Sequence, residues 1–288
     1  MALILPTGTG MTAARQIARR VFAPGLIALG ILGLRYRDFA LIWQPVGASI
    51  PGRTVLAYAS AVLLLFSGIG LLGRRSAPVA ERILFGYLVL WLLLLKVPAI
   101  MSRPTAEGNW SAFGEIAIIA AGSWVLFAWD PPRRATWSSW MTGWRGQRMA
   151  TYLFGVAVVL VGLSHFFYHT ETASLVPKWL PDRSAWAYLT GIAHIAAGIG
   201  VLLGLYARLA ATLEAAMITI FTLFVWIPGV VSAPTNRLQW TALTISWVIA
   251  SGAWVMAVGL AVESSLAVSQ PAPEGSAGNR VTEGIPGV

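Results

Sequence analysis

The chain of 288 residues contains eight long apolar runs, separated by short polar stretches. Each run approaches the roughly 20 residues that an α-helix needs to cross a hydrocarbon core about 30 Å thick. Because lipid offers the backbone no hydrogen-bond partner, the runs predict eight transmembrane helices rather than strands. The composition agrees, since only 11% of the residues are charged, against about 25% in soluble domains. The runs cover residues 22–36, 55–72, 83–101, 112–129, 151–168, 186–204, 209–231 and 240–262.

The net charge of +9 is explained by membrane topology, and we predict no nucleic-acid partner. If successive helices alternate in direction, both termini and most of the arginines fall on one side of the membrane. Positively charged segments stay in the cytoplasm, so we predict a protein of the cytoplasmic (inner) cell membrane with both termini cytoplasmic. The arginines on that side are Arg15, Arg19, Arg20, Arg74, Arg75, Arg82, Arg133, Arg134, Arg145, Arg148 and Arg208.

The second half of the chain resembles the first at a constant offset of 130 residues. The stretch "AYASAVLLLFSGIGLL" begins at Ala57, and "AYLTGIAHIAAGIGVL" begins at Ala187. Because each half holds four helices, an even number, both halves enter the membrane in the same orientation. We therefore predict an all-α integral membrane fold of two tandem four-helix bundles in a parallel repeat, 1–135 and 150–265. The same offset joins Pro51 to Pro181, Pro98 to Pro228, Trp110 to Trp240 and Trp124 to Trp254.

Two further segments lie outside the predicted bundles. Residues 136–149 join the two units, and their aromatic residues recur at helical spacing beside several arginines, which predicts an amphipathic helix that anchors the chain on the membrane interface. Residues 266–288 are rich in Pro, Gly and Ser, and we expect a disordered tail. The apolar face of the linker would be formed by Trp137, Trp140, Met141 and Trp144.

Histidines are the polar residues of greatest interest, because an ionisable group at the centre of a membrane costs about 2.5–3.5 kcal/mol and needs a partner or a function. At 1.5 Å per residue, His165 and His194 fall within roughly 8 Å of the same depth on adjacent antiparallel helices. An imidazole there can exchange protons, donate a hydrogen bond, or bind a haem or a metal. The chain has no cysteine, and we predict no metal site. His169 lies near the outer surface, where we interpret it as an interfacial residue.

Other intramembrane residues have structural interpretations. Lys96 and Glu115 lie at similar depth in the first unit, which predicts a neutralising ion pair. Glu214 is one and a half turns into its helix, where it would reach the surface or pair with Arg208.

Gly191 and Gly198 set a stripe of small residues on the sixth helix. Such stripes let membrane helices approach closely, and this explanation comes first. The two glycines also border His194, so we include them in the hypothesis of a cofactor site.

The run from Gly162 to Gly204 resembles the DoxX family of small four-helix membrane proteins. In DoxX-like members, a G-x-x-H motif is followed by a V-P-x-W-L-P loop and by a helix with the pattern G-x-x-E-x-x-x-G. This sequence has His194 where those members often carry Glu, which puts carboxylate-dependent chemistry in doubt. The matching residues are Gly162 and His165, then Val176, Pro177, Trp179, Leu180 and Pro181, then Gly191 and Gly198.

The resemblance implies a limited set of functions, because the family is named for a thiosulfate:quinone oxidoreductase subunit and some relatives assist the maturation of a partner enzyme. Our first hypothesis is a quinone-linked subunit of a membrane oxidoreductase. In it, His165 and His194 hydrogen-bond a quinone headgroup, and a redox partner delivers electrons. The alternative is a non-enzymatic membrane scaffold or maturation factor for a client protein. Transport of a small solute is a third hypothesis, because parallel repeats occur in carriers.

Overall fold

The computed structural model describes residues 9–130 and 139–269, and in these ranges all regular elements are helical. The long helices are α1 (Thr9–Tyr36), α2 (Arg53–Leu72), α3 (Ala77–Trp91), α5 (Glu107–Ala128), α6 (Gly143–Phe167), α8 (Arg183–Leu202), α9 (Ala207–Phe221) and α11 (Arg237–Ser269). Shorter elements are α4 (Val97–Ser102), α7 (His169–Leu175), α10 (Ile227–Ser232), two π-helical turns, η1 (Leu92–Lys96) and η3 (Thr222–Trp226), and the 3-10 turn η2 (Ser139–Met141).

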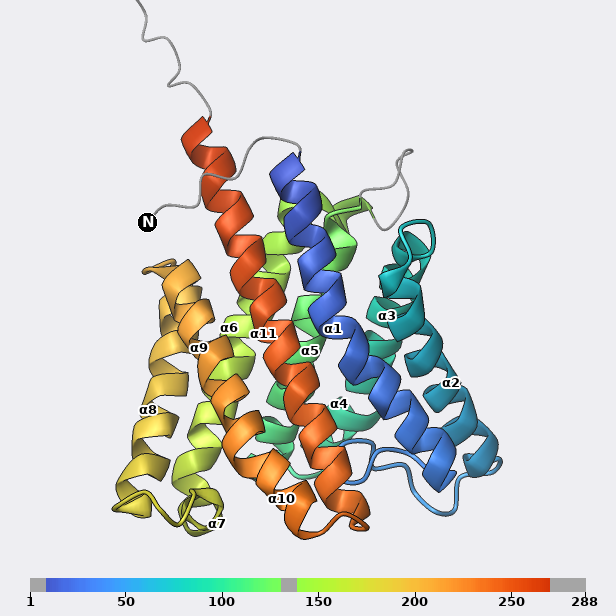
Figure 1. Ribbon diagram of the computed structural model, residues 1–288, viewed down its shortest axis with the longest axis vertical. Helices are drawn as coiled ribbons and strands as arrows, with labels where there is room; N and C mark the ends of the chain where they lie inside the picture. Colours follow the sequence, from blue (N-terminus) through green and yellow to red (C-terminus); the bar gives the residue numbers. More distant parts are fainter. Residues whose placement is uncertain (1–8, 131–138, 270–288) are drawn as a thin grey trace, which may run out of the picture.

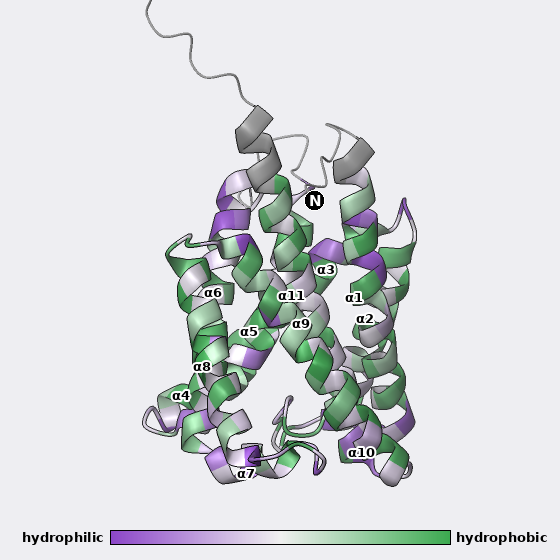
Figure 2. Cartoon of the chain, turned by 60° about the vertical axis from the view of Figure 1, so that its left-hand side comes forward, coloured by the Kyte–Doolittle hydropathy of each residue, from purple (hydrophilic) through white to green (hydrophobic). Residues whose placement is uncertain are grey.

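Eight helical segments are long and apolar enough to cross a membrane, which confirms the predicted number. In two of them a π-helical turn joins two α-helices without a break, so that α3, η1 and α4 form one segment and α9, η3 and α10 another. The apolar residues form the middle of the molecule, and the hydrophilic residues gather toward its two ends (Figure 2). The first segment, Thr12–Tyr36, is longer than the predicted 22–36. Its charged extension is possible because Arg15 and Arg19 pair with Glu81 of α3.

The long helices pack as a closed ring in the order α1, α2, α3, α5, α6, α8, α9 and α11, and α11 returns to α1. α5 and α11 also pack against each other across the centre. Their most apolar stretches are 78% and 72% buried, against 22–44% for the other six, so these two helices form the middle of a single core. Figure 1 shows α2 and α3 on one side of this centre and α6, α8 and α9 on the other.

Each half of the chain shares its core with the other half. The first helix of each half packs closely against the last helix of the opposite half, α1 against α11 and α6 against α5. By contrast, α1 makes few contacts with α5, and α6 makes few with α11. The start of α1 and the end of α11 lie at the same end of the molecule, and α7 and α10 lie at the opposite end (Figure 1).

The boundaries of several elements recur at the offset of 130 residues. α8, α9, η3 and α10 begin and end 130 residues after α2, α3, η1 and α4. Both π-helical turns directly precede a helix with proline in its first turn, Pro98 or Pro228, where the missing N–H and the bulk of the ring disturb the regular helical ladder. The indoles of Trp110 and Trp240 each donate to the carbonyl six residues earlier, both at 2.8 Å.

An ionic contact joins the loop after α1 to the start of α11. Asp38 pairs with Arg53 at 2.6 Å and with Arg237 at 3.2 Å, and Arg237 also donates to the carbonyl of Phe39. Burial by itself raises the pKa of Asp38, but hydrogen bonds from Arg53, the Phe39 amide and Arg237, with the charge of Arg53, lower it below its ordinary value of 3.8. The carboxylate therefore stabilises the contact between the two halves in its ionised form.

The described part of the predicted interfacial helix, 136–149, is not one continuous helix, and this corrects the prediction. Ser139–Met141 form a 3-10 turn, and α6 begins at Gly143, whose φ of 62° interrupts the helical backbone. Trp140 and Trp144 are exposed as predicted, but they belong to different elements. Residues 131–138, including Trp137, lie outside the described residues. Of the predicted tail 266–288, residues 266–269 are part of α11, and the remainder also lies outside them.

Candidate functional site

The candidate site is formed at a close approach of α6 and α8. A Cβ atom on Gly191 would lie 2.7 Å from Cβ of His165, and one on Gly162 would lie 2.9 Å from Cβ of His194. Each glycine thus faces the histidine of the opposite helix. Because neither glycine carries a side chain, the backbones of α6 and α8 can approach closely beside the two histidines.

The structure brings His165 and His194 together, as their predicted depths allow. Their ring centroids are 4.9 Å apart, and the rings are inclined at 49°. Nδ1 of His165 lies 3.1 Å from the carbonyl oxygen of Val161. A carbonyl only accepts a hydrogen bond, so this nitrogen carries the proton and Nε2 has its lone pair available. His165 is half-buried, whereas His194 is only 2% exposed.

His194 is hydrogen-bonded to Glu214 of α9, which the sequence analysis did not include in the site. Nδ1 of His194 lies 2.8 Å from Oε1 of Glu214, and the two side chains are 2% and 0% exposed. Within the part of the chain that the structure describes, Oε2 of Glu214 is buried without a hydrogen-bond partner. The prediction that Glu214 reaches the surface or pairs with Arg208 is therefore wrong.

Helix geometry explains why Glu214 meets His194. His194 lies eight residues before the end of α8, and Glu214 lies seven residues after the start of α9. At 1.5 Å per residue, the two positions differ in depth by about 1.5 Å. The same calculation, applied to every ionisable residue on consecutive helices, would have shown from the sequence that these two lie at similar depth.

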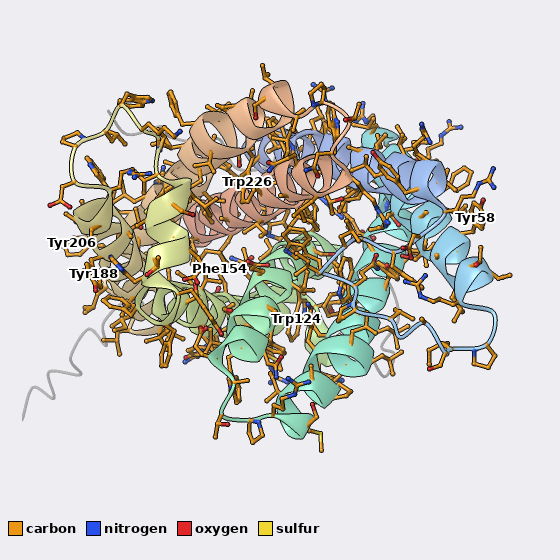
Figure 3. All side chains as sticks on the ribbon, turned by 90° about the horizontal axis from the view of Figure 1, so that it is seen from below. Tyr58, Trp124, Phe154, Tyr188, Tyr206 and Trp226 are labelled. Carbon is orange, nitrogen blue, oxygen red and sulfur yellow. The ribbon has the colours of Figure 1, made fainter. Side chains whose placement is uncertain are left out.

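Aromatic side chains adjoin the His165–His194–Glu214 cluster. The ring of Phe221 packs edge-on to His194 at 6.1 Å. The ring of Phe166 lies next to Gly191, 2.9 Å from the position that a Cβ atom there would take. Its centroid is 5.7 Å from that of the Tyr188 ring. Figure 3 places Tyr188 at the outer edge of the molecule, opposite its counterpart Tyr58. The polar cluster is thus bordered by apolar rings between the core and the surface.

Gly198 and His169 lie beside the cluster but do not belong to it. A Cβ atom on Gly198 would lie 2.7 Å from the carbonyl oxygen of Gly155, so Gly198 serves the packing of α8 on α6. His169 begins α7, bonds Oγ of Ser184 at 2.9 Å and stacks on Tyr188 at 4.1 Å. These contacts lie at a helix end, apart from the pair, and the interpretation of His169 as an interfacial residue stays a prediction.

The predicted Lys96–Glu115 ion pair is not a direct contact. Glu115 accepts a 2.6 Å hydrogen bond from the indole N–H of Trp43, and the carbonyl of Trp43 accepts one from Trp91. Lys96 is 2% exposed and attracts Glu115 electrostatically. The prediction missed Trp43 because this residue lies in the loop after α1, outside the apolar runs.

The fold and the cluster define a protein that is all-helical over its described residues, with eight segments suited to crossing a membrane. A buried His–Glu pair joins α8 to α9, and a second histidine lies beside it on α6. A family model described as "Domain of unknown function (DUF8561)" matches residues 154–257, a range that contains His165, His194 and Glu214. No curated protein and no solved structure matches the chain. Among the described residues, no group of three or more His, Asp or Glu side chains is arranged to hold a metal ion.

Proposed function

We propose that the protein is a DoxX-like multi-pass subunit of the cytoplasmic cell membrane, linked to quinone redox chemistry and formed by tandem duplication of a four-helix unit. The eight apolar segments and the matched element boundaries at an offset of 130 residues support this architecture. The arginine-rich end, where α1 begins and α11 ends, would face the cytoplasm. The residues that resemble the DoxX motifs include Gly162, His165 and Gly191, which meet in or beside the cluster, whereas His194 stands where DoxX-like members often carry Glu.

The buried His194–Glu214 pair beside His165 is the observation that carries the proposal. A quinone headgroup is an apolar ring with two carbonyl oxygens, and it needs one or two well-placed polar groups in apolar surroundings. Nε2 of His165 and Nε2 of His194 make no hydrogen bond within the described residues. Nε2 of His194, when protonated, can donate a hydrogen bond to a quinone carbonyl, whereas the lone pair on Nε2 of His165 can accept one from a hydroxyl of the reduced quinol. Phe166 and Phe221 supply the apolar surroundings.

A bound quinone would supply two-electron, two-proton redox chemistry, and a redox partner protein would supply the electrons. The residues of this chain would hold and move the protons. Glu214 accepts a hydrogen bond from Nδ1–H of His194 and so orients the ring. When Nε2 of His194 also carries a proton, it would donate a hydrogen bond to an oxygen nearby and could release this proton to it. The proton on Nδ1 stays in the hydrogen bond to Glu214, and the Nδ1–H of His165 stays on the Val161 carbonyl.

The test is organic extraction and mass spectrometry of the protein purified in mild detergent, with His194→Leu as the variant and His169→Leu as the matched control. We expect wild type and His169→Leu to carry quinone in near-stoichiometric amount and His194→Leu to lose it while remaining folded. If the wild-type protein is empty and stays empty after quinone is added back, the redox proposal is refuted.

A non-enzymatic scaffold or maturation factor is the second candidate function, and the near-complete burial of His194 and Glu214 favours it. A hydrogen bond between membrane helices contributes about 0.6–2 kcal/mol, which accounts for the pair as a structural link between α8 and α9. On this interpretation, His194→Leu lowers thermal stability or the yield of a copurified client protein. The amount of quinone in the preparation would not depend on His194.

A further inference from the structure

A cavity of about 360 Å³ opens at the end of the molecule where α1 begins, far from the histidine cluster. One face of α1 forms one wall, because residues 12, 15, 16 and 19 follow helical i, i+3, i+4, i+7 spacing. The turn between α2 and α3 and the end of α5 form the remaining walls. The polar and aromatic residues that line the cavity are Thr12, Arg15, Gln16, Arg19, Arg74 and Trp129.

A buried carboxylate fixes two of these arginines in place. Glu81 is 0% exposed, and its two oxygens accept from Arg15 at 2.8 Å and from Arg19 at 2.7 Å. Arg15 also donates to the carbonyl of Trp129 at 3.1 Å. The arginine-bearing wall is therefore preorganised before any ligand arrives.

The cavity retains an excess of positive charge. Glu81 neutralises one of the three guanidinium groups that line it. The next carboxylate, Asp130, lies 3.9 Å from Arg15 but is paired more closely with Arg82, at 2.9 Å. Two positive charges thus remain for a ligand.

Two arginines that line the cavity also have N–H groups that bond no other described residue. The side chain of Arg19 is 11% exposed, and only its Nε atom bonds the protein, so that its two terminal nitrogens have no acceptor within the described residues. Arg74 is exposed and makes no hydrogen bond or ion pair to the same part of the chain. Guanidinium groups in this state match the oxygens of a phosphate, which accepts paired N–H donors.

The depth of the cavity indicates where such a phosphate would come from. Arg19 and Arg15 lie 17 and 21 residues from Tyr36, the last residue of α1. At 1.5 Å per residue this is about 26–32 Å, close to the 30 Å thickness of a hydrocarbon core. If Tyr36 lies at one membrane interface, the arginines lie at the other, level with the lipid phosphates.

We propose that this cavity binds the phosphate of an anionic lipid headgroup, held by Arg19 and Arg74. Arg15 and Glu81 position Arg19, and Trp129 forms the apolar side of the site. Basic pockets between membrane helices bind such headgroups in this way. A soluble phosphate compound presents the same chemistry, so the experiment separates the two sources.

The experiment compares wild type, Arg74→Gln and Arg75→Gln, in which Arg75 is an exposed neighbour that does not line the cavity. Each full-length protein is reconstituted in nanodiscs of phosphatidylcholine with a minority of phosphatidylglycerol, and retained lipid is identified by native mass spectrometry. We expect wild type and Arg75→Gln to retain phosphatidylglycerol selectively, and Arg74→Gln to bind it about fivefold more weakly, as expected for the loss of one arginine near the surface. No selectivity in wild type, or an equal loss in both variants, overturns the proposal.

In a second experiment, inorganic phosphate is titrated into the protein in nanodiscs of phosphatidylcholine alone, and binding is measured by isothermal calorimetry. The lipid source predicts no saturable binding in this experiment. Saturable binding that Arg74→Gln weakens and Arg75→Gln preserves would overturn the lipid assignment in favour of a soluble phosphate compound.

Discussion

Replacing Gly191 with alanine places a methyl group at a close approach of α6 and α8. The new Cβ atom would lie 2.7 Å from Cβ of His165, 2.9 Å from the ring of Phe166 and 3.1 Å from the carbonyl oxygen of Gly162. Favourable carbon–carbon contacts lie at about 3.5–4.0 Å, so the helices must separate by nearly 1 Å. Neither the Cβ atom of His165 nor the backbone of Gly162 can give way by rotating. We expect a loss of about 1–3 kcal/mol in the free energy of unfolding, the usual cost of overpacking.

The assay is reversible unfolding in mixed detergent micelles, followed by tryptophan fluorescence, with Gly86→Ala as the matched control. Gly86 lies in the middle of α3, and a Cβ atom there would meet no atom within 4 Å. Because the Gly191→Ala change also moves His165 away from His194, quinone retention should fall together with stability. Equal free energies of unfolding for the two variants would refute the close approach of α6 and α8, and with it the geometry of the site.

Three further predictions concern charge, pH and the repeat. Glu214→Gln should lose quinone and about 1–3 kcal/mol of stability, because hydrogen bonds to charged groups are stronger than those to a neutral amide and the ring of His194 is then held less firmly. The exposed Glu171→Gln should change neither, and equal quinone content in both variants would contradict this role. The pKa of Asp38 is lowered in the folded protein, so its contribution is fully present above its ordinary value of 3.8 and is lost as pH falls through the folded pKa. Asp38→Asn should therefore reduce stability at neutral pH and flatten its decline in acid, as measured by unfolding at several pH values. Trp110→Phe and Trp240→Phe each remove one matched hydrogen bond and should cost a similar 0.5–1.5 kcal/mol, about the net value of such a bond; unequal losses in fluorescence-detected unfolding would show that the two halves differ at this position.

The sequence predicted the eight helices and the similar depth of His165 and His194, and both have local causes. A bilayer requires each apolar run to satisfy its own backbone hydrogen bonds, so the number and type of elements follow from hydropathy. Depth along a helix follows from a fixed rise per residue, which is why the two histidines were expected at one level. Gly191 was also visible in the sequence, as part of a stripe of small residues on the sixth helix.

The linker shows where local periodicity is insufficient. Its aromatic spacing predicted one amphipathic helix, but Gly143 has a left-handed backbone and starts a separate element there. The spacing of aromatic side chains carries no information about the backbone conformation of a glycine that lies between them.

Only the tertiary structure decided which helices are neighbours and how each one is rotated. The partners of Glu214 and Glu115 are His194, on a neighbouring helix, and Trp43, in a loop. The first helix of each half packs against the last helix of the other half, and α5 and α11 meet at the centre. This arrangement was equally invisible in the apolar runs. Hydropathy fixes where a helix crosses the membrane, but its rotation and its neighbours depend on side-chain packing summed over the whole ring.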